Sequence, residues 1–251
     1  MNLAFDWAIL GAPLLAGLVV IATHVALGRE VLRRGIIFID LTVAQVAAVG
    51  VILAEMLEFS GEQGWKVQVA AGIAALLAAG LLAWTEQRWP QLQEALIGSL
   101  YVVAACAAIL LLAHNPHGHE HLAELLAGQI LWVNLPQVWP VAALSAFVLA
   151  AWFLGGQRRG WIFYFLFAIT VMASVQLVGV FLVFASLILP ALASSGLPER
   201  RGLIVGWGLG AVGYALGLWL SVPLDLPAGP MIVCTLAVLA LLAAVARSLR
   251  R

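Results

Sequence analysis

The chain has 251 residues, of which 64% are hydrophobic, and its 12 basic and 12 acidic residues give a formal net charge of zero. A soluble globular domain is only about 45–50% apolar, so this composition excludes a soluble fold. Nearly all of the charged residues lie between long apolar runs or at their ends, and they form no basic face of the kind that binds nucleic acid. The sequence therefore predicts a multi-pass protein of a lipid bilayer.

The apolar runs have the length of membrane spans, because about 20 helical residues cross a hydrocarbon core of about 30 Å. The start of the chain lacks a basic n-region, so the first run is interpreted as a transmembrane helix and not as a cleaved signal. Single spans are expected at 7–27, 36–57, 67–84, 95–113, 138–154, 203–220 and 231–245.

Two further segments complete the predicted fold. The run of 33 residues from Trp161 to Ala193 is too long for one helix and is divided into a hairpin at Gly179. The segment Leu122–Leu135 precedes two prolines and is expected to form a short interfacial or re-entrant helix. We therefore expect an all-α transmembrane bundle over residues 1–251, as a single domain with about eight full spans and one short helix.

The basic residues predict the orientation of this bundle. Eleven of the 12 basic residues fall on one side of the predicted spans, and the acidic loop with Lys66, the histidine loop and Asp225 fall on the other. Basic loops face the cytoplasm, so the N-terminus is expected outside and the C-terminus inside. Both flanks of the Trp161–Ala193 run are basic, so that run must cross an even number of times, which supports the hairpin independently.

The stretch Arg33–Gly50 carries polar residues inside an apolar run, and we expect it to line a solute path. Asp40, Thr42 and Gln45 are these polar residues. A carboxylate in the hydrocarbon region costs at least about 2.5–3.5 kcal/mol, so it normally faces a bundle interior or a water-filled path. Alternatively, Asp40 lies near the cytoplasmic end and pairs with an arginine that begins the stretch, while Gln45 bonds a neighbouring helix.

A loop rich in histidine is a second candidate site. Four of the five histidines of the chain fall within eight residues, at His114, His117, His119 and His121. Neutral imidazole is a good ligand for zinc, copper, nickel and iron, but this spacing is not that of a closed structural zinc site. We expect a weak, exchanging site that collects metal; the alternative is a solvated loop that binds nothing. His24, alone in the first span, is expected to be a packing residue.

A third candidate region follows the proposed hairpin. Gly179 permits a tight reversal, and Pro190 is expected to end or kink the short helix after it. The chain contains no G-x-x-x-x-G-K-[ST] sequence, so any ATP hydrolysis would belong to a separate protein. The alternative is an ordinary re-entrant hairpin that has no connection with an ATPase.

The stretch from Arg33 to Gly50 also resembles a known family. Its basic pair, glycine, aromatic residue and polar helix ending in VAQVAAVG are similar to the second-helix signature of bacterial ABC-transporter permeases for zinc, manganese and related metals. That family usually has Asp and His one helical turn apart on the same face. Here Gln45 stands at the histidine position, Leu41 lies one turn before it, and Asp40 is displaced by one position.

Other blocks resemble the same family in the same order, so the likeness covers nearly the whole chain. They are EALIGSLY at 94–101, LLAGQIL at 125–131, the glycine-to-proline block at 176–193, and DLPAGP at 225–230. The block at 176–193 is the most recognisable, and in the family the segment after its proline includes the coupling helix that docks on the ATPase. The resemblance places ATPase coupling here at Pro190, Ser194, Ser195, Glu199, Arg200 and Arg201, within or just before ALASSGLPERR.

The resemblance implies the membrane subunit of an ATP-driven importer in the bacterial cytoplasmic (inner) membrane. The transported ion would be a divalent transition metal, with zinc favoured and manganese or iron as alternatives, and no permanently bound cofactor is expected. The implied partners are a second copy of the chain, cytoplasmic ATP-binding subunits, and a periplasmic or extracellular metal-binding protein. The permease itself would not be an enzyme.

Two other classes of function compete with this interpretation. A proton-coupled metal transporter needs several intramembrane acids or histidines as a relay, and Asp40 is the only clear mid-sequence acid. An intramembrane enzyme needs a catalytic motif, and no G-x-S-x-G or H-E-x-x-H sequence stands in a predicted span.

Overall fold

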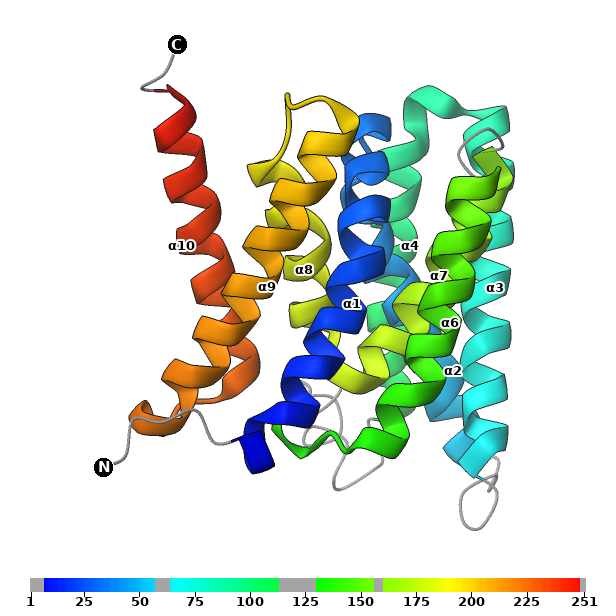
Figure 1. Cartoon of the computed structure of the whole chain (residues 1–251). Helices are drawn as coiled ribbons and strands as arrows, with labels where there is room; N and C mark the ends of the chain where they lie inside the picture. Colours follow the sequence, from blue (N-terminus) through cyan, green and yellow to red (C-terminus); the bar gives the residue numbers. More distant parts are fainter. Residues whose placement is uncertain (1–6, 57–63, 113–129, 156–159, 249–251) are drawn as a thin grey trace. The chain divides into compact units, whose positions relative to one another are not determined.

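The computed structural model describes residues 7–56, 64–112, 130–155 and 160–248, and within these ranges the chain is helical and contains no β-strand (Figure 1). The α-helices are α1 (Trp7–Arg34), α2 (Ile39–Met56), α3 (Gly64–Arg88), α4 (Gln93–Leu112), α6 (Leu135–Leu154), α7 (Gly160–Val178), α8 (Val180–Ala193), α9 (Glu199–Leu224) and α10 (Ala228–Ser248). Two 3-10 turns, η1 (Pro90–Leu92) and η2 (Ile130–Trp132), complete the described elements. The prediction of an all-α fold is confirmed for these residues.

Seven of the described helices are long and apolar enough to span a membrane, whereas α2 and α8 are shorter apolar helices. The expectation of about eight full spans and the predicted orientation of the termini stay predictions. Most of the expected short helix at Leu122–Leu135 lies outside the described residues. Its described end contains η2, and α6 begins at Leu135, earlier than the span expected from 138.

The chain forms two compact units. The first comprises Met1–Arg34, Leu126–Ala146 and Ser174–Arg251, and the second comprises Gly35–Leu125 and Phe147–Ala173. Helices α6 and α7 therefore each contribute residues to both units. The predicted single domain over 1–251 stays a prediction.

In the first unit, helix α9 packs against both α1 and α10 (Figure 1). Glycines make these contacts close: an added Cβ at Gly210 would lie 2.6 Å from Ile21 Cδ1 of α1, and one at Gly217 would lie 2.5 Å from Ile232 Cα of α10. Small residues commonly permit such approach between membrane helices. The glycine-rich stripe of α9 is thus used for packing inside the chain.

The first helix is longer than the sequence predicts. It was expected to end after Leu27, at Gly28, but α1 continues to Arg34. A side chain at Gly28 would overlap the carbonyl oxygen of Leu187 in α8, so this glycine serves close packing and not termination. Gly35, with φ of 72°, follows the last helical residue and adopts the left-handed conformation that commonly ends helices.

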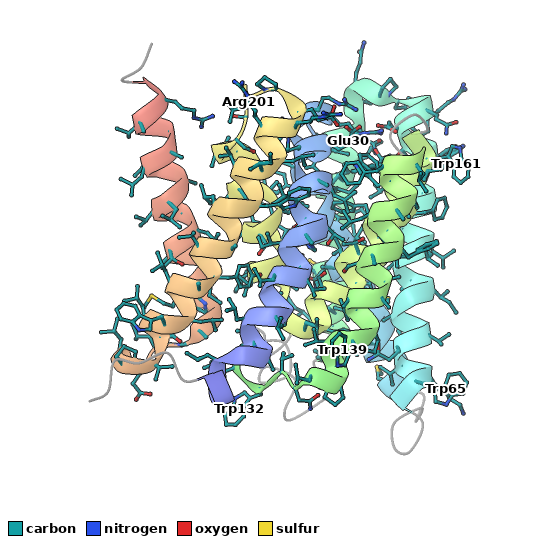
Figure 2. All side chains as sticks on the ribbon, viewed as in Figure 1. Glu30, Trp65, Trp132, Trp139, Trp161 and Arg201 are labelled. Atoms are coloured by element: carbon teal, nitrogen blue, oxygen red, sulfur yellow. The ribbon has the colours of Figure 1, made fainter. Side chains whose placement is uncertain are left out.

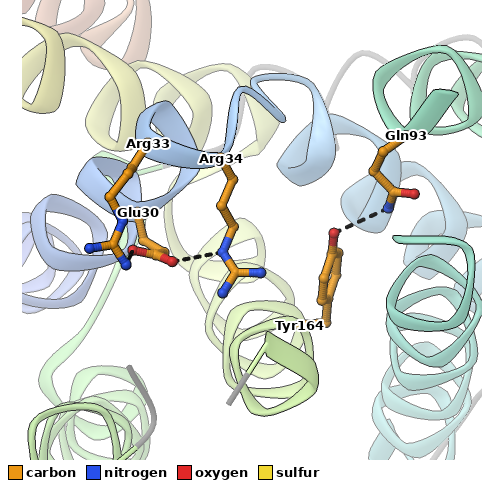
Figure 3. Close-up of polar contacts among 5 residues, drawn as sticks. All are labelled: Glu30, Arg33, Arg34, Gln93 and Tyr164. Atoms are coloured by element: carbon orange, nitrogen blue, oxygen red, sulfur yellow. Dashed lines mark hydrogen bonds and ion pairs between the residues drawn. The ribbon is translucent and has the colours of Figure 1, made fainter. Parts of the chain in front are cut away.

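In the second unit, α2 packs against both α3 and α4, and a buried glutamine joins α3, α4 and α7. Gln93 Oε1 accepts a hydrogen bond from Thr85 Oγ1 at 2.9 Å, and Gln93 Nε2 donates to Leu82 O at 2.9 Å. The same nitrogen donates to Tyr164 Oη at 3.1 Å, as Figure 3 shows. A buried amide with several partners fixes the relative positions of these helices.

Exposed tryptophans lie near the ends of each unit (Figure 2). In the first unit, Trp132 and Trp139 lie at the end opposite to Glu30 and Arg201. In the second unit, Trp65 and Trp161 lie at opposite ends. Tryptophan is enriched at both membrane–water interfaces, so these positions agree with helices that cross a bilayer.

Candidate translocation path and coupling turn

Asp40 lies in the first turn of α2, at a helix start that two carboxylates stabilise. The carboxylate of Glu94 of α4 interacts with the backbone N–H groups of Ile37 and Phe38, just before α2, while its Oε2 has no hydrogen-bond partner in the ranges that the structure describes. The first N–H groups of a helix have no partner inside it, and the N-terminus carries partial positive charge. Asp40 and Glu94 therefore both interact favourably with the N-terminus of α2. This interaction is one reason for a polar residue at position 40.

Asp40 itself is almost completely buried, with 1% of its surface exposed. Apart from the nearby amide groups of Asp40 and Leu41, its carboxylate oxygens have no hydrogen-bond partner among the described residues. A buried carboxylate is costly unless a cation or several donors compensate it. Asp40 is thus a buried acid whose surroundings in the described part of the chain satisfy it incompletely.

Thr42 is fully buried, and its hydroxyl joins two helices. Its Oγ1 lies 3.0 Å from Phe38 O and 3.0 Å from Ile97 O of α4, so one proton is shared between two carbonyls. The sequence predicts that Thr42 lines a solute path. Its contacts show that the hydroxyl also ties α2 to α4.

Gln45 is 7% exposed, and most other residues of α2 are also covered. Asp40, Thr42 and Gln45 therefore all lie within the folded chain and not on an outward face. Arg33 and Arg34 of α1 both pair with Glu30 (Figure 3). The alternative of an arginine partner for Asp40 stays a prediction.

The metal-ligand prediction rests on residues that the structure leaves outside its description. His114, His117, His119 and His121 all lie in 113–129, so their proposed role stays a prediction. Within the described ranges, no group of three or more His, Cys, Asp or Glu side chains could hold a metal ion. His24 is fully buried, as expected of a packing residue; its Nδ1 lies 2.8 Å from Val20 O, but its Nε2 has no hydrogen-bond partner among the residues described.

A helix break at Gly179 is present as the sequence predicts. Helix α7 ends at Val178 and α8 begins at Val180, with Gly179 at φ 82° and ψ 162° between them. Its N–H donates to Val175 O at 2.8 Å, and its carbonyl accepts from Val183 N at 3.1 Å. The break is therefore confirmed, while its function as a gate or hinge stays a prediction.

Pro190 does not end α8, contrary to one of the two outcomes expected for it. The helix continues to Ala193, because the carbonyl of Pro190 still accepts a hydrogen bond from Ser194 N at 3.1 Å. A turn at residues 194–198 then leads directly into α9. The segment predicted to couple to an ATPase, 191–201, thus consists of the end of α8, this turn and the start of α9, and it forms no separate helix. Gly196, at φ 76°, lies at the centre of the turn.

This turn has an exposed tip and a buried base. Ser194 is fully buried, whereas the exposed residues are Ser195, Gly196, Pro198, Glu199, Arg200 and Arg201. Two arginines that the sequence did not single out hold it. Arg29 of α1 donates to Ser194 and Leu197, and Arg247 Nη1 of α10 donates to Ser195 O at 2.6 Å. No local sequence pattern predicts these contacts, because they join residues more than 50 positions apart.

The ABC 3 transport family model matches residues 6–160 and 156–247 of the chain. This chain belongs to the ABC 3 transport family. The family resemblance that the sequence suggested is thereby confirmed. Family membership leaves the individual site residues as predictions, because it does not by itself assign Asp40, Thr42 or Gln45 a role.

Relatives of this ABC 3 family member include an uncharacterized membrane protein of Synechocystis sp., 25% identical over 92% of this chain and 88% of that protein. A Chlamydia trachomatis protein named as a metal transport system membrane protein is 22% identical over 90% of this chain and 82% of the relative.

Two solved structures share the fold. PsaBC from Streptococcus pneumoniae in complex with Fab matches with a TM-score of 0.76 and 20% identity, over 95% of this chain and 91% of that one. An inward-facing structure described as a metal-chelate type ABC transporter matches with a TM-score of 0.70 and 18% identity, over 93% and 84% of the two chains.

Proposed function

We propose that this chain is the membrane subunit of an ATP-driven importer for a divalent transition metal ion, with zinc favoured and manganese or iron as alternatives. The match to the ABC 3 transport family over nearly the whole chain carries this proposal. The name of the Chlamydia relative supports a metal cargo. Two copies of the chain form the path, and an extracytoplasmic binding protein delivers the metal.

Energy enters from separate cytoplasmic ATPase subunits, since the sequence has no P-loop. We assign their contact to the exposed residues at and after the turn that follows α8, which are Ser195, Glu199, Arg200 and Arg201. Pro190 and Ser194 are buried, and we propose them as coupling residues that lie behind this surface. This assignment has physical support: the tip is exposed while its base is buried and held by arginines. The chain performs no chemistry of its own in this scheme.

Metal passage uses the polar part of α2. Asp40 supplies negative charge that a passing cation can compensate, and Gln45 supplies a carbonyl oxygen. Oxygen ligands suit manganese better than zinc. Selectivity for zinc would therefore come from the outer histidine loop and the binding protein, and not from Asp40 and Gln45. Because these side chains are buried, transport requires alternation between states, and ATPase partners act by stabilising those states differentially.

Transport by the reconstituted complex tests the proposal. The chain is purified with its ATPase and placed in liposomes with the binding protein, and uptake of radioactive Zn²⁺ is measured. ATP on the side of the membrane that holds the ATPase subunits is expected to drive Zn²⁺ uptake. A non-hydrolysable ATP analogue on the same side is expected to give no uptake. Equal uptake from a proton gradient alone would contradict the importer and favour the proton-coupled transporter.

Metal specificity is tested in the same liposomes. Uptake of Zn²⁺ is measured with Mn²⁺ or Fe²⁺ as competitor, at equal free-ion concentrations. Zinc is expected to enter fastest and to be displaced only by a large excess of the others. Faster uptake of Mn²⁺ than of Zn²⁺ would assign manganese as the cargo and leave the transporter class unchanged.

A further inference from the structure

The end of α1 is joined to the turn after α8 by one arginine. Arg29 Nη1 donates to Ser194 O at 2.7 Å and to Ser194 Oγ at 3.0 Å, and Arg29 Nη2 donates to Leu197 O at 3.1 Å. The two carbonyls belong to residues just after α8, where helix ends leave acceptors without intrahelical partners. Arg29 thus binds both sides of the turn at once.

The packing of α9 provides the space that this contact needs. Gly202 lies in the first turns of α9, and its missing side chain leaves room that the guanidinium of Arg29 occupies. A methyl group at Gly202 would overlap Nη1 of that guanidinium. Gly208, on the same helix, has no atom within 4 Å of the place its Cβ would take. The space left by the missing side chain of Gly202 is therefore filled by the guanidinium of Arg29 from α1.

A second arginine, Arg247, contacts the turn nearer its tip. Arg247 Nη1 donates to Ser195 O at 2.6 Å, and Arg247 Nε donates to Ala243 O of its own helix at 3.1 Å, which orients the guanidinium. Ser195 is exposed, whereas Ser194 is buried. The bonds to Arg29 therefore lie at the base of the turn and the bond to Arg247 lies near its tip.

We propose that Arg29 is a positioning residue for coupling: it fixes the 194–198 turn to α1, so that a displacement of the exposed tip moves α1 and is not absorbed by the turn. This inference rests on the proposed function, which assigns the tip to an ATPase. Arginine suits the task because its planar fork can donate to several acceptors at once, whereas lysine is a single flexible point charge.

Two different substitutions test the same contact. Arg29→Gln removes the guanidinium, and Gly202→Ala leaves Arg29 in place but fills the space it occupies. In liposomes that hold the whole complex, both variants are expected to lower Zn²⁺ uptake per ATP hydrolysed by roughly tenfold, as fits loss of charge-assisted hydrogen bonds. ATP hydrolysis and co-purification of the ATPase should persist. Arg29→Lys should fall between the wild type and Arg29→Gln.

Matched controls and a double variant make the test specific. Arg33→Gln removes a positive charge one turn further along α1, and Gly208→Ala adds a methyl group to α9 where there is space for it. Both controls should keep the wild-type value of Zn²⁺ uptake per ATP hydrolysed. Because the two test substitutions break one contact, the Arg29→Gln, Gly202→Ala double variant should be no worse than either single variant.

Three results would overturn the inference. The first is a wild-type value of Zn²⁺ uptake per ATP hydrolysed in Gly202→Ala. The second is a loss of this uptake in the double variant that equals the sum of the two single losses. The third is failure of the ATPase to co-purify with Gly202→Ala. The last result would mean that Arg29 shapes a docking surface and does not transmit its motion. A wild-type complex without ATP-dependent uptake would instead refute the proposed function, so the two failures are distinguishable.

Discussion

Replacing Asp40 with Asn should stabilise the protein while it slows transport. A charge at membrane depth costs about 2.5–3.5 kcal/mol. The positive end of α2 recovers about 0.3–1 kcal/mol of this, and the amide that replaces the carboxylate still leaves a buried polar group that costs about 1 kcal/mol. The net gain expected for Asp40→Asn is about 1 kcal/mol, which raises the Tm of a chain of this size by about 2–4 °C.

Glu30 provides the matched control, since it is also a buried acid but has two arginine partners. Its side chain is 6% exposed and pairs with Arg33 and Arg34. Removing one member of a buried pair costs about 3–5 kcal/mol, and the 70% exposure of the Arg33 side chain reduces the expected loss. Glu30→Gln should therefore lower Tm, whereas Asp40→Asn should raise it.

Thermal unfolding of the purified protein in detergent measures both shifts, and Zn²⁺ uptake by the complex measures the function. A lower Tm for Asp40→Asn would show that the acid has a structural partner that stabilises the native state. Unchanged uptake by that variant would remove Asp40 from the path. Either result would refute the reasoning that connects its incomplete hydrogen bonding with a passing cation.

Three further sets of substitutions test other parts of the structure. Thr42→Val should lower stability by about 0.6 kcal/mol, and by no more than about 1.7, because it removes the tie to Ile97 O, and Thr42→Ser should restore it in denaturant unfolding. Gly28→Ala should cost about 1–3 kcal/mol in the same assay, because the new methyl group overlaps Leu187 O; a neutral effect would contradict the packing of α1 on α8. Alanine at His114, His117, His119 and His121 should slow uptake at low Zn²⁺ and spare it at high Zn²⁺, so equal loss at every concentration would exclude a collecting function.

The helical fold could be predicted because its signal is local. Apolar runs of membrane length predict helices directly, and Gly179 marks a reversal because few other residues tolerate its backbone conformation. The boundaries were less predictable. Gly28 has the appearance of a terminator in sequence, but the neighbouring helix α8 determines its role by approaching too closely for any side chain.

The candidate site was only partly predictable for the same reason. The sequence shows that Asp40 is an acid in an apolar run, but not that Glu94 caps the same helix end from α4. The arginines were attributed to membrane orientation, except for Arg200 and Arg201. The structure gives Arg29 and Arg247 specific acceptors in a turn that is 165 and 52 residues away, respectively. Contacts at such separations leave no periodic pattern.

The reversal at Gly179 has a consequence for where it can be placed in the bilayer. Both its amide and its carbonyl are used, by Val175 and Val183, so the chain changes direction without leaving either group unsatisfied. Non-helical backbone at membrane depth normally depends on water or on neighbouring protein to compensate its polar groups. Because both groups at this corner have partners in the adjacent helices, the break between α7 and α8 can lie at membrane depth without water to satisfy them.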